Sequence, residues 1–110
     1  MGITKTNLYT KEHNEQAELF KAIGHPARLK IVIHLLREKS CICGDIVDVV
    51  KLAQPTITRH LKVLKDAKVI KGSIEGNKVC YCINAESFRA LKGIISLMEV
   101  EALGINGGCC

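Results

Sequence analysis

The sequence predicts a mainly α-helical fold with one small β-hairpin, and three observations lead to this class. Apolar residues recur every three or four positions through most of the chain, which is the period of an amphipathic helix. Around residues 69–83 the period changes and a Gly-Asn turn interrupts the pattern, which is typical of a hairpin. The length of 110 residues suits one domain, and its core must be aliphatic because the chain has no Trp, two Phe and two Tyr.

Two helices are predicted in the first third of the chain. The first spans residues 11–23 and ends at Gly24. Its buried side is expected to consist of Ala17, Phe20 and Ile23. Pro26 suits the first turn of the second helix, where its missing N–H costs nothing. The polar stripe of that helix includes His34, which we therefore expect to face solvent and not to bind a metal.

The middle of the chain predicts two helices separated by a tight turn. Residues 40–43 are expected to be extended and to lead through Gly44 into a short third helix. The inward residues of this helix are Ile46, Val49 and Val50. After about three residues a fourth helix begins at Gln54 or Pro55 and ends near Ala67. Its buried face is expected to consist of Ile57, Leu61 and Leu64.

The hairpin and a last helix complete the predicted domain over residues 1–110. The strands are expected at 69–74 and 79–83 around a turn at 75–78, and the helix runs from Asn84 to Leu103. The helix is rich in apolar positions: Phe88, Leu91, Ile94, Ile95, Leu97 and Met98. This apolar surface is too wide for one core contact, so we expect a partner helix, most economically in a symmetric dimer. Residues 104–110 are expected to form a flexible tail.

The sequence also predicts the cellular location of the protein. No run of about 18 uninterrupted apolar residues could span a membrane. Residues 1–12 are polar and do not resemble a signal peptide, so we expect a cytoplasmic protein with no membrane partner.

The net charge of +5 is concentrated in one segment. Residues 51–78 contain seven Lys or Arg and two acidic residues, whereas the rest of the chain is neutral. A basic segment on a neutral body indicates a polyanionic partner. Charge alone is equally compatible with a lysine-rich face that only contacts solvent.

A short helix, a tight turn and a second helix with polar and basic side chains form a helix-turn-helix, here over residues 44–67, with the hairpin at 69–83 as a wing. Gln can recognise adenine, Arg can recognise guanine, and Thr can contact a thymine methyl group or a phosphate. The side chains expected to contact bases are Gln54, Thr56, Thr58 and Arg59. Those expected to contact phosphates are Lys62, Lys65 and, on the wing, Lys78. We therefore predict a protein that binds double-stranded DNA.

Three segments resemble the ArsR/SmtB family of metal-responsive repressors. Residues 23–29, 54–64 and 75–81 have the sequences IGHPARL, QPTITRHLKVL and EGNKVCY. The resemblance covers about residues 19–83. It implies a winged helix-turn-helix homodimer whose first and last helices form the interface, and a repressor that leaves its operator when an effector binds. His60 resembles the histidine of the family's recognition helix, which implies a structural or phosphate-contacting role.

Two residues depart from the family pattern. Lys51 stands where the turn often has Gly, and a left-handed residue there would cost roughly 1 kcal/mol. Ala53 stands where Ser commonly caps the recognition helix, which forfeits up to about 1 kcal/mol.

The six cysteines occur as three close pairs: Cys41/Cys43, Cys80/Cys82 and Cys109/Cys110. Residues two apart share one side of an extended segment but not of a helix, and the first two pairs lie on predicted extended segments. Such segments commonly pair in winged-helix domains, so up to four thiolates could converge on zinc or cadmium, or three on trivalent arsenic. The alternative is that these cysteines are small buried apolar residues.

The cysteine pairs extend the resemblance. Cys41 and Cys43 resemble the Cys-Val-Cys pair of arsenic and cadmium sensors of the family, although they lie one residue earlier. Cys109 and Cys110 resemble the tail pair of some arsenic sensors. The family's zinc or cobalt site on the last helix is not expected, because no His follows His60. The predicted effector is arsenite first and then cadmium or zinc, with no obligatory cofactor.

An enzyme is not expected, because there is no Cys-x-x-Cys, no parallel βαβ pattern, and no nucleophile, base and acid spaced together. Two alternatives stay open on the DNA-binding fold. The cysteines could sense oxidation or persulfides, or they could bind a structural zinc whose removal would unfold the protein.

Overall fold

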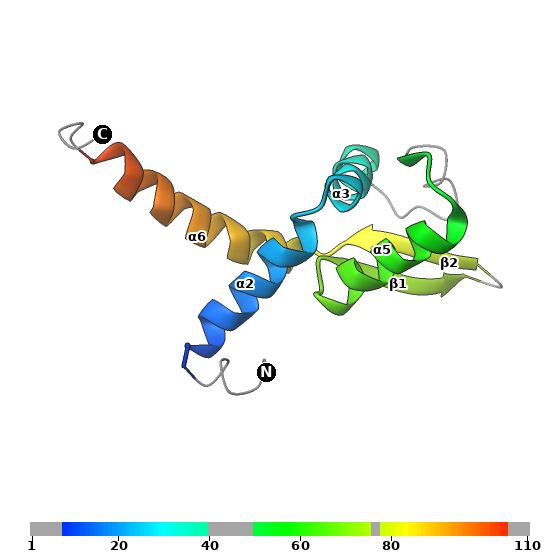
Figure 1. The fold of residues 1–110 in the computed structure, drawn as a ribbon, viewed down its shortest axis with the longest axis horizontal. Coiled ribbons are helices and arrows are strands. Elements are labelled where there is room, and N and C mark those ends of the chain that lie inside the picture. The colour runs from blue at the N-terminus through cyan, green and yellow to red at the C-terminus, as the bar shows by residue number, and fades with distance from the viewer. Residues whose placement is uncertain (1–7, 40–49, 76–77, 106–110) are drawn as a thin grey trace.

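The computed structural model describes residues 8–39, 50–75 and 78–105, which form four helices and one antiparallel hairpin (Figure 1). The elements are α2 (Lys11–Ile23), α3 (Pro26–Glu38), α5 (Gln54–Asp66), β1 (Ile70–Glu75), β2 (Lys78–Ile83) and α6 (Ala85–Leu103). In Figure 1, α3, α5 and the hairpin gather on one side, and α6 extends away from them. The predicted class, helices with one small hairpin, is confirmed.

The core lies where α2, α3, α5 and the hairpin meet. Its most deeply buried side chains are aliphatic and at most 1% exposed: Ile31, Leu35, Ile57, Leu64, Val69 and Ile70. Leu91 of α6 joins the edge of this cluster. The core therefore consists of branched aliphatic side chains from both the helices and the hairpin, as the scarcity of aromatic residues predicts.

Local signals place both ends of α2 and the start of α3 where they were predicted. The side chain of Thr10 accepts a hydrogen bond at the start of α2, and Gly24 is the residue that caps its end. Pro26 occupies the first turn of α3 and His25 caps that helix.

The predicted buried side of α2 is wrong. Leu19 and Ala22 are the buried residues of this helix, whereas Ala17 and Phe20 are exposed and Ile23 is half-buried. Helix α2 has apolar residues on two sides, and the side that includes Leu19 is the one that packs in the core of the protomer.

Helix α5 and the hairpin follow the predictions closely. The buried residues of α5 are the predicted Ile57, Leu61 and Leu64. The two strands pair from Ile70 opposite Ile83 to Glu75 opposite Lys78. The strands thus extend one residue further toward the turn than the alternating pattern indicates.

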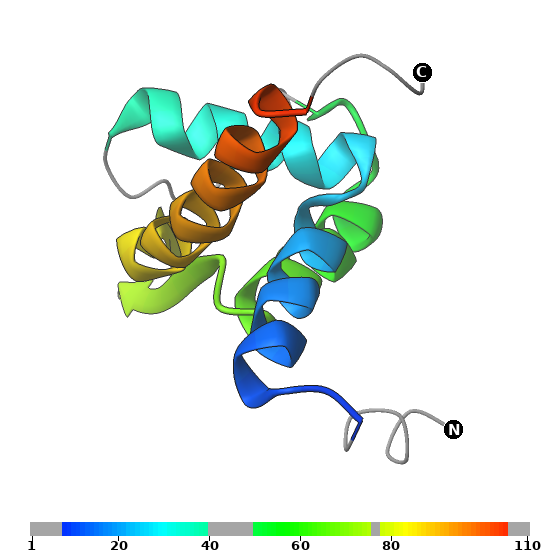
Figure 2. The ribbon, with the colours of Figure 1, turned by 90° about the vertical axis from the view of Figure 1, so that its left-hand side faces the viewer.

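Helix α6 begins directly after Asn84, as predicted, and leaves the core along its length. Leu91 is buried, but further along the helix the apolar side chains are exposed, from Leu97 at 56% to Leu103 at 80%. Figure 2 views the molecule from the side on which α2 and α6 leave the core. The described helices include none with the length and apolarity needed to cross a membrane.

Several predictions concern residues outside the described part of the chain. They are the extended segment and most of the third helix at 40–49, the turn residues 76 and 77, and most of the tail, at 106–110. Cys41, Cys43, Cys109 and Cys110 are among these residues.

Candidate DNA-binding surface and thiol pair

Helix α5 is held by one face and presents the other to solvent. Its three buried residues are between 0% and 5% exposed. At the preceding turn Lys51 has a left-handed φ of 59°, and Ala53 at the N-cap makes no side-chain cap hydrogen bond. Each of these features costs on the order of 1 kcal/mol. Burying one Leu or Ile side chain contributes about 1.5–3 kcal/mol, so packing holds α5 in place despite the weak cap.

The side chains predicted to contact bases lie on the first half of α5. Gln54, Thr58 and Arg59 are exposed, and Thr56 is half-buried. The side-chain amide of Gln54 donates to the hydroxyl of Thr58 at 3.3 Å, which links two neighbouring positions on the outer face. This face therefore offers an amide, a hydroxyl group and a guanidinium group on a rigid helix.

The lysines predicted to contact phosphates occupy the second half of α5 and the hairpin. Lys62 is exposed, and its Nζ lies 2.9 Å from Oδ2 of Asp66. Lys65 lies across β1: a Cβ built on Gly72 would lie 3.4 Å from Lys65 Cε. Lys78 begins β2 next to the turn of the hairpin. Lys62 and Lys65 thus place positive groups on α5, and Lys65 brings one of them beside β1.

His60 has one neighbour that the sequence analysis missed. Its ring centroid lies 4.5 Å from that of His25, whose Nδ1 accepts a hydrogen bond from the backbone N–H of Ala27. Burial and the positive neighbours His25, Arg28 and Arg59 lower the pKa of His60. The His-Pro pair signals the capping role of His25, because a residue just before a first-turn proline occupies the N-cap position. It gives no signal for the contact with His60.

The structure describes one of the three cysteine pairs. Cys80 and Cys82 lie on β2 as predicted, separated by one residue, so their side chains point to the same side of the strand. Cys80 is 1% exposed, Cys82 is half-buried, and both are disulfide-bonded. Across the hairpin they stand opposite Ser73 and Lys71. Among the described residues no group of three or more His, Cys, Asp or Glu side chains could hold a metal ion.

Similar sequences were found among regulators of transcription. An uncharacterised helix-turn-helix regulator of Methanocaldococcus jannaschii is 38% identical over 91 residues, which span 81% of this chain and 97% of the relative. The transcriptional repressor PagR of Bacillus anthracis is 37% identical and is matched over 77% of this chain and 82% of the repressor. The arsenical resistance operon repressor of Bacillus subtilis is 33% identical, with 83% of each chain covered.

Solved structures with this fold belong to the same class. An ArsR family transcriptional regulator superposes with a TM-score of 0.72 at 18% identity, covering 84% of this chain and 95% of the regulator. A homodimeric winged helix-turn-helix domain from Mycobacterium bovis superposes with a TM-score of 0.63 at 19% identity, covering 88% and 89%. Residues 25–71, from the cap of α3 to the first strand, match the description of bacterial regulatory proteins of the arsR family. With this match and relatives of 37–38% identity over most of its length, the chain belongs to the arsR family of transcriptional regulators.

Proposed function

We propose that the chain is a cytoplasmic, homodimeric repressor that binds operator DNA and leaves it when its cysteine thiolates bind arsenite or, as second choices, cadmium or zinc. The observation on which DNA binding rests is α5, a helix fixed in the core by one face with Gln54, Thr58 and Arg59 exposed on the other. These three side-chain types suit hydrogen bonding to base edges in the major groove. The lysines at positions 62, 65 and 78 then contact phosphates on either side.

The proposed dimer forms through α2 and α6. These helices flank a groove whose lining includes Leu19, Ile94 and Leu97. Gly93 lies on this groove, and a Cβ built there would meet no atom within 4 Å, so a partner helix can approach closely. The winged helix-turn-helix domain from Mycobacterium bovis is homodimeric, which supports a dimer. A two-fold dimer implies an operator with half-sites about one helical turn apart, or a multiple of it.

The proposed inducer site has Cys41 and Cys43 as its core, with Cys80 and Cys82 as the additional ligands. Once reduced, Cys80 and Cys82 place two thiolates on the same side of one strand, which suits a soft ion that prefers thiolate ligands. Cys109 and Cys110 are the alternative source of ligands. The arsenical resistance repressor of Bacillus subtilis, at 33% identity, supports arsenite as the first choice. Reversing a 99:1 preference for the bound state needs about 5.5 kcal/mol, which several thiolate bonds can supply.

A second candidate is a repressor that responds to thiol oxidation. The specific observation in its favour is that Cys80 and Cys82 are both disulfide-bonded. Oxidation would then change the same strand that the metal would bind, but by a covalent bond that a reductant reverses.

Release from operator DNA separates the two candidates. Fluorescence anisotropy of labelled operator is measured with the reduced protein and increasing arsenite, cadmium or zinc, and separately with a disulfide-forming oxidant and no metal. Metal sensing predicts release of the reduced protein by arsenite, and loss of that release in Cys41→Ser, Cys43→Ser, Cys80→Ser and Cys82→Ser with operator affinity retained. The double variant Cys109→Ser/Cys110→Ser is the matched control and should respond normally. Release by the oxidant alone supports the second candidate, and a metal response lost only in the tail variant refutes the assigned ligands.

A further inference from the structure

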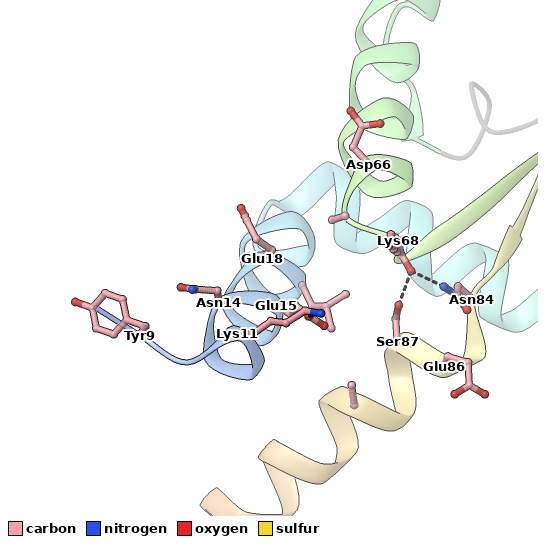
Figure 3. Close-up of a pocket in the computed structure, with 13 residues that line it drawn as sticks. Tyr9, Lys11, Asn14, Glu15, Glu18, Asp66, Lys68, Asn84, Glu86 and Ser87 are labelled. Atoms are coloured by element: carbon pink, nitrogen blue, oxygen red, sulfur yellow. Dashed lines mark hydrogen bonds and ion pairs between the residues drawn. The ribbon is translucent and has the colours of Figure 1, made fainter. Parts of the chain in front are cut away.

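Three hydrogen bonds join the segment that follows the recognition helix to the start of α6, and Figure 3 draws the two that end on Lys68. The side-chain amide of Asn84 donates to the carbonyl oxygen of Lys68 at 2.9 Å, and the hydroxyl of Ser87 donates to the same oxygen. The backbone N–H of Asn84 donates to the carbonyl of Val69 at 3.1 Å. We call this group of residues, 68, 69, 84 and 87, the joint.

Two residues of the joint, Asn84 and Lys68, have unusual hydrogen bonding or backbone conformation. Asn84 occupies the N-cap of α6, where an Asn side chain usually accepts a hydrogen bond from the helix, yet it makes no cap hydrogen bond. Lys68 has a φ of 67°, a left-handed conformation that is unfavourable for a lysine. Ser87 is 8% exposed, and its hydroxyl donates to Lys68. Both side chains therefore donate to one carbonyl oxygen, and the left-handed backbone of Lys68 orients that oxygen toward them.

The joint connects two parts of the protein with different tasks. Lys68 follows α5 by two residues, and backbone hydrogen bonds from Lys68 and Val69 return to Lys65 and Leu64 of that helix. Asn84 and Ser87 lie at the N-cap and in the first turn of α6, the helix that extends away from the core in Figure 1. Helix α5 packs on α2, α3 and β1, whereas α6 packs on α2, so the joint is a direct polar link between 68–69 and the dimer helix.

A cavity borders the joint on one side. Its volume is about 950 Å³, and its lining comes from α2, the end of α5 and the start of α6, with Lys68, Asn84 and Ser87 on one wall (Figure 3). The cavity leaves room for Lys68, Asn84 and Ser87 to move when their hydrogen bonds are lost. The hydrogen bonds to the Lys68 carbonyl act together with the packing of α6 on α2 to fix the angle between α5 and α6.

We propose that Asn84 and Ser87 are positioning residues that hold the recognition helix at one angle to the dimer helix and so set the half-site spacing that the dimer accepts. The proposal rests on the proposed function, in which α6 forms the dimer and α5 contacts DNA. Moving one half-site by one base pair shifts it by about 3.4 Å along the helix axis and rotates it around that axis. A dimer with a rigid joint cannot follow that shift, whereas a dimer with a loosened joint can.

The test uses the full chain with Asn84→Asp and Ser87→Ala, singly and together. Asp has the size of Asn and is a good helix cap, but as a carboxylate it cannot donate to the Lys68 carbonyl, so the variant loses the hydrogen bond without losing α6. Ser73→Ala, which removes an exposed hydroxyl from β1, is the matched control. Dissociation constants are measured for the operator, for operators with the half-sites one base pair closer or further apart, and for a single half-site.

For the wild type and Ser73→Ala, the dissociation constant should be on the order of a hundredfold higher for the shifted operators than for the operator, because the second half-site no longer contributes. For the double variant, the dissociation constant should rise less than about tenfold on the shifted operators. This variant should bind the single half-site with the affinity of wild type. Discrimination by the double variant equal to that of wild type would overturn the proposal.

A measurement without DNA separates the joint from the proposed function. Spin labels on unnatural amino acids at Thr58 of α5 and Lys92 of α6, in dimers diluted with unlabelled chains, report the distance between the two helices. A broader distance distribution in the double variant than in wild type supports the joint even if no operator is found. An unchanged distribution overturns it even if DNA binding is confirmed.

Discussion

Replacing Asp66 with Asn should tighten DNA binding about twofold or more without destabilising the fold. Asp66 pairs with Lys62 at 2.9 Å, and both side chains are largely exposed, at 64% and 73%. Such an i,i+4 pair is worth about 0.3–0.5 kcal/mol, which Lys62 must give up to contact a phosphate. This corresponds to a factor of about two in the dissociation constant, since about 1.4 kcal/mol is tenfold. Removing a carboxylate beside the DNA acts in the same direction.

The stability of this variant should change little. The lost ion pair is offset because an acidic residue in the last turn of a helix is disfavoured by the helix dipole, by about 0.3–1 kcal/mol. Anisotropy titrations at two salt concentrations measure the gain, which should shrink at high salt because the charges are screened. The matched control is Glu86→Gln, which breaks the exposed Glu86–Arg89 pair on α6 and should leave DNA affinity unchanged. Unchanged or weaker binding of Asp66→Asn would refute the assignment of Lys62 as a phosphate contact.

Three further predictions concern the recognition helix, the dimer and the histidine pair. Arg59→Ala should cost about 1–3 kcal/mol in operator binding and relax the base preference at one position. Lys65→Ala should weaken binding to all DNA sequences alike and reduce the salt dependence of binding. If both variants weakened binding to specific and to random DNA equally, the assigned contacts would be contradicted. Leu97→Glu places a charge in the α2–α6 groove and should yield monomers by analytical ultracentrifugation, so an intact dimer would place the interface elsewhere. Since the pKa of His60 is lowered in the folded protein, its stabilising effect is complete above the unfolded pKa of about 6.5 and is lost as the pH falls through the lowered value. The free energy of unfolding should therefore decrease below about pH 6.5 more steeply in wild type than in His60→Gln, and parallel pH profiles in denaturant titrations would exclude this cause.

The end of α2, the start of α3 and the buried face of α5 could be predicted because their signals are local. Gly24 disfavours continuation of a helix and Pro26 fixes its own φ, so each acts at its own position. The spacing of Ile57, Leu61 and Leu64 defines one face of a helix with few competing apolar residues. The position of Cys80 and Cys82 on one side of a strand follows from the alternation of an extended chain in the same way.

The tertiary structure decided the features that depend on which surfaces meet. The apolar residues of α2 fit burial on either of two sides, and only its packing in the protomer selects the side of Leu19 over that of Phe20. Asn84 was predictable as the start of α6, but not as a donor to Lys68, because that contact spans 16 residues and competes with the cap that local sequence favours. The contact between the rings of His25 and His60 likewise joins two separate elements. Periodicity and capping preferences describe interactions within one or two turns, so the sequence determined the elements and the exposed face of α5, while long-range packing determined how those elements are linked.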